Sequence, residues 1–306
     1  MFLGICYGFA AALCNSIGYL CSAFFLKKYP STFKLLVIAF SWMFFLSLPI
    51  LICVWPKENI VNLTQLLLLL PVWCLVFCFA QYCFFSGLKY IEASRFSSLL
   101  GLKIIVLTIL YTAINFTIPN IGKISSVLLA TLAAYLINST AQKGDNSVNK
   151  SSFKGIFFVA GTLVFYCLAD IIETKMMMIL QNSGISNLRS SFIATSMSYV
   201  SLGVISLPLL FKVKFDKTAL KLNLPYAILW LLSQYFLLAC FGLVLPIFGN
   251  VILASRGIIS VILGALLCYL GYKNVDANIP LKMWIKRTIA AIIMISAIAL
   301  YAYSSR

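Results

Sequence analysis

Apolar segments long enough to cross a lipid bilayer recur along the chain from Met1 to Tyr303. A membrane-spanning α-helix needs about 20 predominantly apolar residues. The chain is 62% hydrophobic and 10% charged, with a mean hydropathy of +1.04. A water-soluble domain usually has about 25% charged residues, so this chain has too little polar surface to cover a globule in water. These properties predict an all-α integral membrane protein and exclude soluble, secreted and nucleic-acid-binding proteins.

Clusters of charged residues divide the chain into ten predicted transmembrane helices. These cover about residues 2–26, 32–54, 64–88, 94–114, 120–138, 155–179, 190–211, 223–244, 248–271 and 284–303. Each segment is apolar continuously rather than at alternate residues, which excludes a transmembrane β-barrel. All ten helices are expected to belong to one membrane domain.

The uneven distribution of Lys and Arg between the predicted loops indicates the orientation. The net charge is +16, and most of the cations lie in the first, third, fifth, seventh and ninth loops. The even-numbered loops and the termini hold only Lys57, Lys123, Arg189 and Arg306. Cytoplasmic loops carry the excess of Lys and Arg. Both termini are therefore expected outside the cytoplasm, in a multi-pass protein of the bacterial cytoplasmic membrane.

The two halves of the sequence repeat each other. At an offset of 153 residues, Gln81-Tyr82 aligns with Gln234-Tyr235, and Lys103 aligns with Arg256 without a gap. Residues 1–145 and 146–306 each hold five predicted helices, an odd number, so the two repeats must be inverted relative to each other. Inverted repeats are typical of secondary transporters, whose substrate site lies near the midplane between the repeats.

Ten predicted helices, a five-plus-five repeat and short loops resemble the drug/metabolite transporter superfamily, specifically its ten-helix EamA-like members. The resemblance covers essentially the whole chain. It implies secondary active transport by alternating access through a central cavity. The superfamily includes exporters of amino acids and drugs and exchangers of sugar phosphates and nucleotide sugars.

Lys103 and Arg256 are cations at repeat-equivalent positions inside predicted helices 4 and 9. A cation near the bilayer centre is unfavourable by about 2.5–3.5 kcal/mol on insertion scales. We expect the two side chains to reach one central cavity and bind an anionic group, since Arg provides a planar fork for carboxylate or phosphate and Lys a point charge. The alternative is that Lys103 extends to the interface and Arg256 pairs with a structural carboxylate.

Other polar side chains inside the predicted helices are further candidates for substrate contacts. The duplicated pairs Gln81-Tyr82 and Gln234-Tyr235 offer amides that can orient a ligand and rings that can form a wall. Asn15 interrupts the first predicted helix and is a candidate for the same cavity. A buried amide needs hydrogen-bond partners, so interhelical hydrogen bonding is the alternative role for these residues.

Asp170 and Glu173 are the only acidic residues inside the apolar segments, and both lie in the sixth predicted helix. Together with Tyr166 they follow an i, i+4, i+7 spacing, which places all three on one helix face. Glu173 is expected nearer the membrane surface than Asp170. The pair is predicted to be a coupling site or a counter-charge for a substrate ammonium. The alternative is an ion pair with Arg256 or Lys175.

The residue types and motifs that the sequence lacks exclude further classes of function. The sequence contains no histidine and no CxxC pair among its ten cysteines, so no metal or cofactor is expected. An ATP-binding loop and the acidic DxxD motif of lipid transferases are also missing, so an enzyme is not expected. The predicted partners are the lipid bilayer and a small metabolite carrying a carboxylate or phosphate. An amino-acid or drug exporter and a lipid flippase remain alternatives, and the protein is expected to be a monomer or homodimer.

Overall fold

The computed structural model describes residues 1–56, 62–87, 90, 99–115, 120–139, 152–213, 216–256, 259, 262–263 and 281–304. Throughout these residues the regular elements are helices. They are α1 (Phe2–Lys28), α2 (Thr32–Val54), α3 (Leu63–Gly87), the 3₁₀ turn η1 (Leu100–Leu102), α5 (Lys103–Asn115), α6 (Ile121–Ser139), α7 (Ser152–Asn182), α8 (Asn187–Leu210), α9 (Lys217–Val244), α10 (Pro246–Leu253) and α12 (Leu281–Ser304).

Six of these helices, α1, α2, α3, α7, α8 and α9, are long and apolar enough to cross a membrane. Their sequences are apolar on all sides, which suits helices that contact both lipid and protein. The expectation of an all-helical, multi-pass integral membrane protein is thereby confirmed. Helices α5 and α6 are shorter, and parts of the fourth and ninth predicted segments lie outside the described residues.

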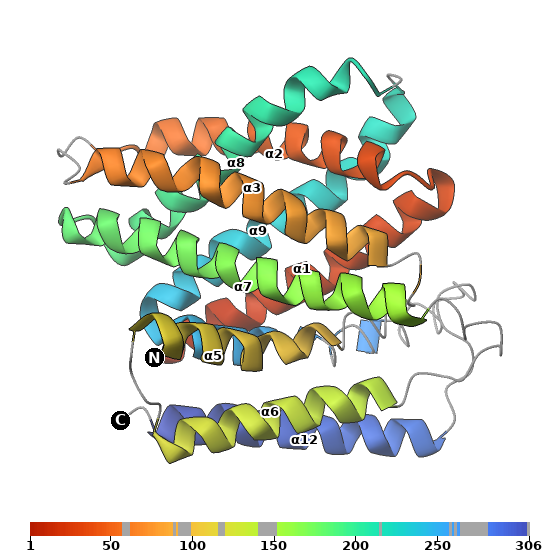
Figure 1. The fold of residues 1–306 in the computed structure, drawn as a ribbon, viewed down its shortest axis with the longest axis vertical. Coiled ribbons are helices and arrows are strands. Elements are labelled where there is room, and N and C mark those ends of the chain that lie inside the picture. The colour runs from red at the N-terminus through yellow and green to blue at the C-terminus, as the bar shows by residue number, and fades with distance from the viewer. Residues whose placement is uncertain are drawn as a thin grey trace.

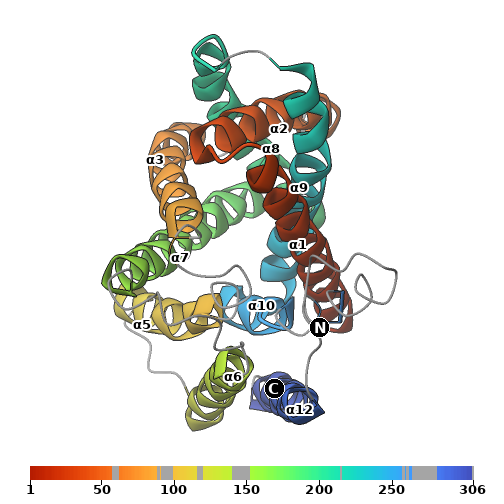
Figure 2. The same ribbon diagram turned by 90° about the vertical axis from the view of Figure 1, so that its right-hand side faces the viewer.

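The helices form two walls that are joined at the top and the bottom by helix pairs (Figure 2). One wall contains α3, α7 and α5, and the other contains α9, α1 and α10. Helix α2 packs against α8 at one edge, and α6 packs against α12 at the other. Within the walls, α1 packs along α9 and α3 packs along α7. The start of α1 and the end of α12 lie at the same end of the bundle (Figure 1).

Breaks in the helical backbone occur in both walls. Helix α9 ends at Leu245, whose φ of 71° lies in the left-handed region, and Pro246 then begins the eight-residue α10. Proline fits the first turn of a helix because that turn leaves its N–H groups unpaired anyway. In the other wall, η1 precedes α5, which begins at Lys103. Lys103 therefore lies at the start of α5, and Arg256 lies three residues beyond the end of α10.

Contacts tie the first half of the chain to the second at both ends of the bundle. At one end the Tyr29 hydroxyl donates a hydrogen bond to Asp216, and Lys34 Nζ lies 3.9 Å from the same carboxylate. At the other end the Arg189 guanidinium donates to the backbone carbonyls of Val54 and Trp55, at 3.1 Å in both cases. Both contacts join a loop or helix end of the first half to one of the second.

The contact between Tyr29 and Asp216 predicts a pH dependence of stability. The Tyr29 hydroxyl lowers the pKa of Asp216, and this carboxylate raises the pKa of Tyr29. An acid with a lowered pKa stabilises the fold above its ordinary value of about 3.9, and this contribution is lost as the pH falls through the lowered pKa. Because the two side chains are partly exposed to solvent, the effect is expected to be small.

This dependence can be measured on the purified protein by thermal unfolding in detergent across acidic pH. We expect the Asp216→Asn variant to unfold at a lower temperature than the parent near neutral pH and at a similar temperature below the lowered pKa of Asp216. A difference between the two proteins that stays constant across this range would contradict the prediction.

Candidate substrate-binding cavity

A cavity lies between the two walls, near the middle of several of the helices. It is lined by Asn15 and Tyr19 of α1, Phe77 of α3, Lys103 of α5, Tyr166, Ala169, Asp170 and Glu173 of α7, Trp230, Gln234 and Leu237 of α9, Leu253 of α10, and Arg256. Seven of these lining residues are apolar or aromatic, and six are polar or charged. Apolar walls with convergent polar groups are a feature of sites that bind small organic molecules.

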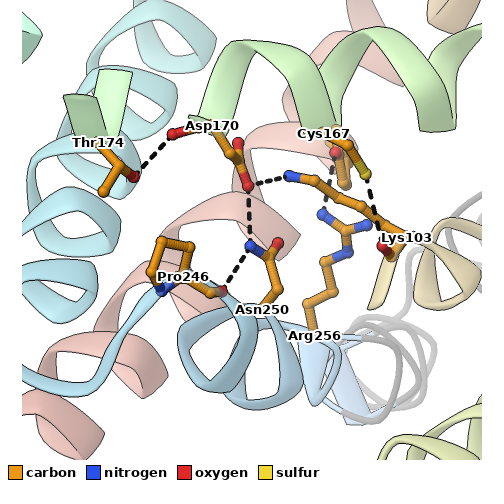
Figure 3. A network of polar contacts seen from close by, with 8 residues as sticks. Lys103, Cys167, Asp170, Thr174, Pro246, Asn250 and Arg256 are labelled. Carbon is orange, nitrogen blue, oxygen red and sulfur yellow. Dashed lines mark hydrogen bonds and ion pairs between the residues drawn. The ribbon is translucent and has the colours of Figure 1, made fainter. Parts of the chain in front are cut away.

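Lys103 of α5 and Asp170 of α7 form a buried ion pair on one side of the cavity (Figure 3). The Lys103 Nζ lies 2.7 Å from Asp170 Oδ2, and the Asn250 amide donates to the same oxygen at 2.8 Å. Asn250 also donates to the Pro246 carbonyl, at 2.9 Å, which joins the ion pair to the first turn of α10. The Cys167 thiol donates to the backbone carbonyl of Lys103 at 3.5 Å. Each charge of the pair therefore has a partner in the protein.

Arg256 lines the same cavity but has a different environment. Its side chain is buried, and its guanidinium carbon lies 5.7 Å from the centre of the Tyr19 ring. The guanidinium Nη1 donates to the Tyr19 hydroxyl at 3.5 Å, and Nε has no hydrogen-bond partner among the residues that the structure describes. Among the described residues, no carboxylate lies within ion-pair distance of Arg256. The sequence left open that Arg256 forms an ion pair with a structural carboxylate. Such a pair is not formed within the described part of the chain.

Glu173 is buried in the wall of the cavity, one helical turn from Asp170. Only 7% of the residue is exposed, and its Oε1 has no hydrogen-bond partner among the described residues. Trp73 and Thr195 lie beside it without forming a hydrogen bond of regular geometry. The sequence placed Glu173 near the membrane surface, but α7 extends to Asn182 and keeps this residue inside the bundle.

Of the remaining predicted residues, Asn15 and Gln234 line the cavity. The Asn15 amide also donates to Ser233 at 3.3 Å, a contact between α1 and α9. Gln81 is fully buried but is not part of the cavity lining, and neither atom of its amide has a hydrogen-bond partner in the part of the chain described.

The two tyrosines of the duplicated pairs lie away from the cavity. Tyr82 is 57% exposed on the outer surface of α3, with its ring against Phe158. Tyr235 is buried, and its hydroxyl lies 2.7 Å from that of Ser196, which is an interhelical contact between α8 and α9. Adjacent residues on a helix point in directions about 100° apart, so only one member of each pair can face inward.

Asn250 and the aromatic lining were not selected as site residues from the sequence. Asn250 is a lone amide in the apolar segment that forms α10, and this isolation was the available signal. Tyr166 lies on the same face of α7 as the two acids, as its spacing predicted, and Lys103 Nζ is 5.5 Å from its ring centre. Trp230 gave no such signal because aromatic residues are frequent throughout the chain.

The helices define a multi-pass membrane protein with a cavity between them that charged and aromatic side chains line. Residues 2–139 match the EamA-like transporter family. This match over part of the chain confirms the expected resemblance to the drug/metabolite transporter superfamily. The match to a transporter family indicates the transport of a small molecule across a lipid bilayer.

The fold is also found among proteins of known structure. Twenty-eight solved chains match. One is a crystal structure that aligns over 97% of this chain and 95% of its own length, with a TM-score of 0.63 and 11% sequence identity. At this identity the similarity concerns the fold alone. No curated protein has a significantly similar sequence.

Proposed function

We propose that the protein is a secondary active transporter that moves a small organic metabolite carrying a carboxylate or phosphate through the central cavity. The observation that carries this proposal is the environment of Arg256. A buried guanidinium without a carboxylate partner is unfavourable, and an anionic ligand beside it supplies the missing charge. Arg can hold a carboxylate or a phosphate by two parallel hydrogen bonds.

The arrangement of the helices supports alternating access between two inverted five-helix repeats, residues 1–145 and 146–306. When the two repeats are exchanged, α7 takes the place of α1 and α3 takes the place of α9. The packing of α1 on α9 then corresponds to the packing of α7 on α3. The exchange also relates the contact between α1 and α10 to that between α7 and α5. We infer ten transmembrane helices in this arrangement, with both termini outside the cytoplasm of a bacterial cell. A monomer or a homodimer fits the proposed mechanism equally.

Within the cavity, we assign Arg256 as the principal anchor and Lys103 as the second cation. Lys103 is held by Asp170, so a substrate anion reaches it only in competition with this carboxylate. The aromatic rings of Tyr19, Phe77 and Trp230 provide an apolar wall for the body of the substrate. Gln234 and Asn15 supply amides that can orient it. Gln81, Tyr82 and Tyr235 are not part of this proposal.

An amphoteric metabolite such as an amino acid is the second candidate substrate. The observation that favours it is Glu173, a buried carboxylate without a cationic partner in the described part of the chain. A zwitterion can place its carboxylate beside Arg256 and its ammonium beside Glu173. This arrangement would correspond to an amino-acid exporter of the same fold.

Uptake into liposomes that contain the purified protein tests the proposal with matched probes. N-acetyl-leucine is an anion, N-acetyl-leucinamide is its neutral counterpart, and leucine is a zwitterion; glycerol 3-phosphate and glycerol form a second pair. We expect the acidic probes to enter faster than their neutral counterparts and faster than into protein-free liposomes. Faster entry of leucine than of N-acetyl-leucine would favour the second candidate. Equal entry of all probes into both kinds of liposome would contradict transport, and exchange of fluorescent lipids between leaflets would favour a flippase.

A further inference from the structure

The cavity contains two cations and two carboxylates, and they are not paired equally. Lys103 and Asp170 compensate each other at 2.7 Å. Arg256 and Glu173 are left, and neither has an oppositely charged partner among the described residues. When an anion binds beside Arg256 while Glu173 is ionised, the four side chains and the anion together carry one net negative charge. Uncompensated charge in a water-poor interior is strongly unfavourable.

Building on the proposed function, we propose that Glu173 binds the proton that accompanies an anionic substrate. The proton comes from water on the side from which the substrate enters, binds one carboxylate oxygen of Glu173, and leaves to water on the other side. With this proton the loaded cavity is electrically neutral. A monoanion and one proton therefore bind together and cross the membrane together, and each increases the affinity for the other by the same factor.

The surroundings of the two acids distinguish Glu173 from Asp170 as the protonated group. The carboxylate of Asp170 is stabilised in its ionised form by the ammonium of Lys103 and the amide of Asn250. Glu173 has no such cation. The ionisable and polar groups that face it are Lys103 of α5, Asp170 of α7, Trp73 of α3, Thr195 and Tyr199 of α8, and Tyr235 of α9. Lys103 is the one cation among these, and its charge is already compensated by Asp170.

The position of Glu173 also allows a proton to respond to the substrate. Glu173 and Arg256 line the same cavity, so an anion placed beside Arg256 acts on Glu173 through a poorly screening interior. Because Oε1 has no hydrogen-bond partner among the described residues, it can accept a proton without breaking a hydrogen bond that they form. Asp170 would have to leave Lys103 or Asn250 to do the same.

A first experiment tests the state of Glu173 without any ligand. Infrared difference spectroscopy of the reconstituted protein during a pH titration detects the carbonyl stretch of protonated carboxyl groups. We expect Glu173→Gln to remove one titrating band that the Asp216→Asn control retains. The Arg256→Gln variant removes a positive charge from the cavity. Its electrostatic effect on Glu173 should therefore resemble that of an anion bound beside Arg256. In this variant the band should persist to a pH higher by about one unit, a tenfold shift in proton affinity.

A second experiment follows the proton during transport. Liposomes containing the protein and an internal pH-sensitive dye receive the monoanion N-acetyl-leucine from outside, with protein-free liposomes as the control. We expect the parent protein to acidify the interior along with uptake. In Glu173→Gln, whose side chain is permanently neutral, uptake should continue without acidification and lose its pH dependence.

The outcomes separate this inference from the proposed function. Uptake of the acidic probes without proton entry, or proton entry that survives in Glu173→Gln, would show that Glu173 is not the proton site while leaving transport intact. Loss of leucine uptake alone in Glu173→Gln would assign the carboxylate to a substrate ammonium and overturn the inference. No uptake of any probe would contradict the proposed function, and the infrared titration would still decide on Glu173. A carboxyl band that is unchanged in Arg256→Gln would overturn the coupling between the two residues.

Discussion

Replacing Arg256 with Gln is expected to reduce the uptake of N-acetyl-leucine or glycerol 3-phosphate about 100-fold. Hydrogen bonds to charged groups contribute about 1.5–3 kcal/mol each in a buried site, and a factor of ten corresponds to about 1.4 kcal/mol. Losing a paired contact between the guanidinium and an anion therefore accounts for a reduction of this size. Arg256→Lys retains the charge but not the planar fork, so its uptake should fall between those of the parent and Arg256→Gln.

Lys175→Gln is the matched control for this prediction. Lys175 is an exposed cation on α7 and does not line the cavity, so its replacement should leave uptake at the parent level. Uptake is measured as the initial rate in liposomes with equal amounts of protein, after gel filtration has shown that each variant is folded. If Arg256→Gln transports acidic probes at the parent rate, Arg256 is a structural residue and the anchor of the proposed site is incorrect.

Replacing Lys103 with Gln is expected to destabilise the protein more than any other single change in the cavity. The replacement leaves the Asp170 carboxylate buried with only the Asn250 amide as a partner. Removing one member of a buried ion pair is unfavourable by about 3–5 kcal/mol, whereas removing both charges together is much less so. The double variant Lys103→Gln with Asp170→Asn should therefore be more stable than Lys103→Gln alone.

Thermal unfolding of the parent, the two single variants and the double variant completes a double-mutant cycle. The expected coupling energy between Lys103 and Asp170 is of the same order as the loss in the single variant. A double variant no more stable than Lys103→Gln would show that the ion pair contributes little and that Lys103 acts through its packing against Tyr166. Uptake by a folded double variant then measures the contribution of Lys103 to transport, separately from its effect on stability.

The overall organisation could be predicted from the sequence because membrane helices are specified by the length and apolar character of each segment. The predicted segment 32–54 has the bounds of α2, and the segment 223–244 ends where α9 ends. Predicted segment 155–179 is shorter than α7 because Lys154 was taken as a boundary, whereas a Lys at a helix end can extend to the interface. The interruptions at η1 and before α10 were not foreseen, since neither segment loses its apolar character there.

The cavity was predictable only where a polar side chain had no alternative to the interior. Lys103, Asp170 and Arg256 are charged, so lipid-facing positions were excluded for them. Tyr82 is amphipathic and can face lipid, and α3 is apolar on all sides, so its sequence did not indicate which face is buried. The depth of Glu173 depended on the length of α7, and the contact of Asn250 with Asp170 depended on the packing of α10 against α7. These last two features arise from tertiary packing, which periodicity alone does not report.

The contacts at the two ends of the bundle have a bioenergetic consequence. A continuous aqueous path through the charged cavity would let ions leak, and a potential of 100 mV does about 2.3 kcal/mol of work on each unit charge that crosses. In the proposed transport mechanism, the contact between Tyr29 and Asp216 at one end and the contacts of Arg189 with Val54 and Trp55 at the other join the two halves where such a path would open. Under the proposed alternating access, a cell that makes this protein would keep its membrane energised only if one of these contacts held whenever the other opened.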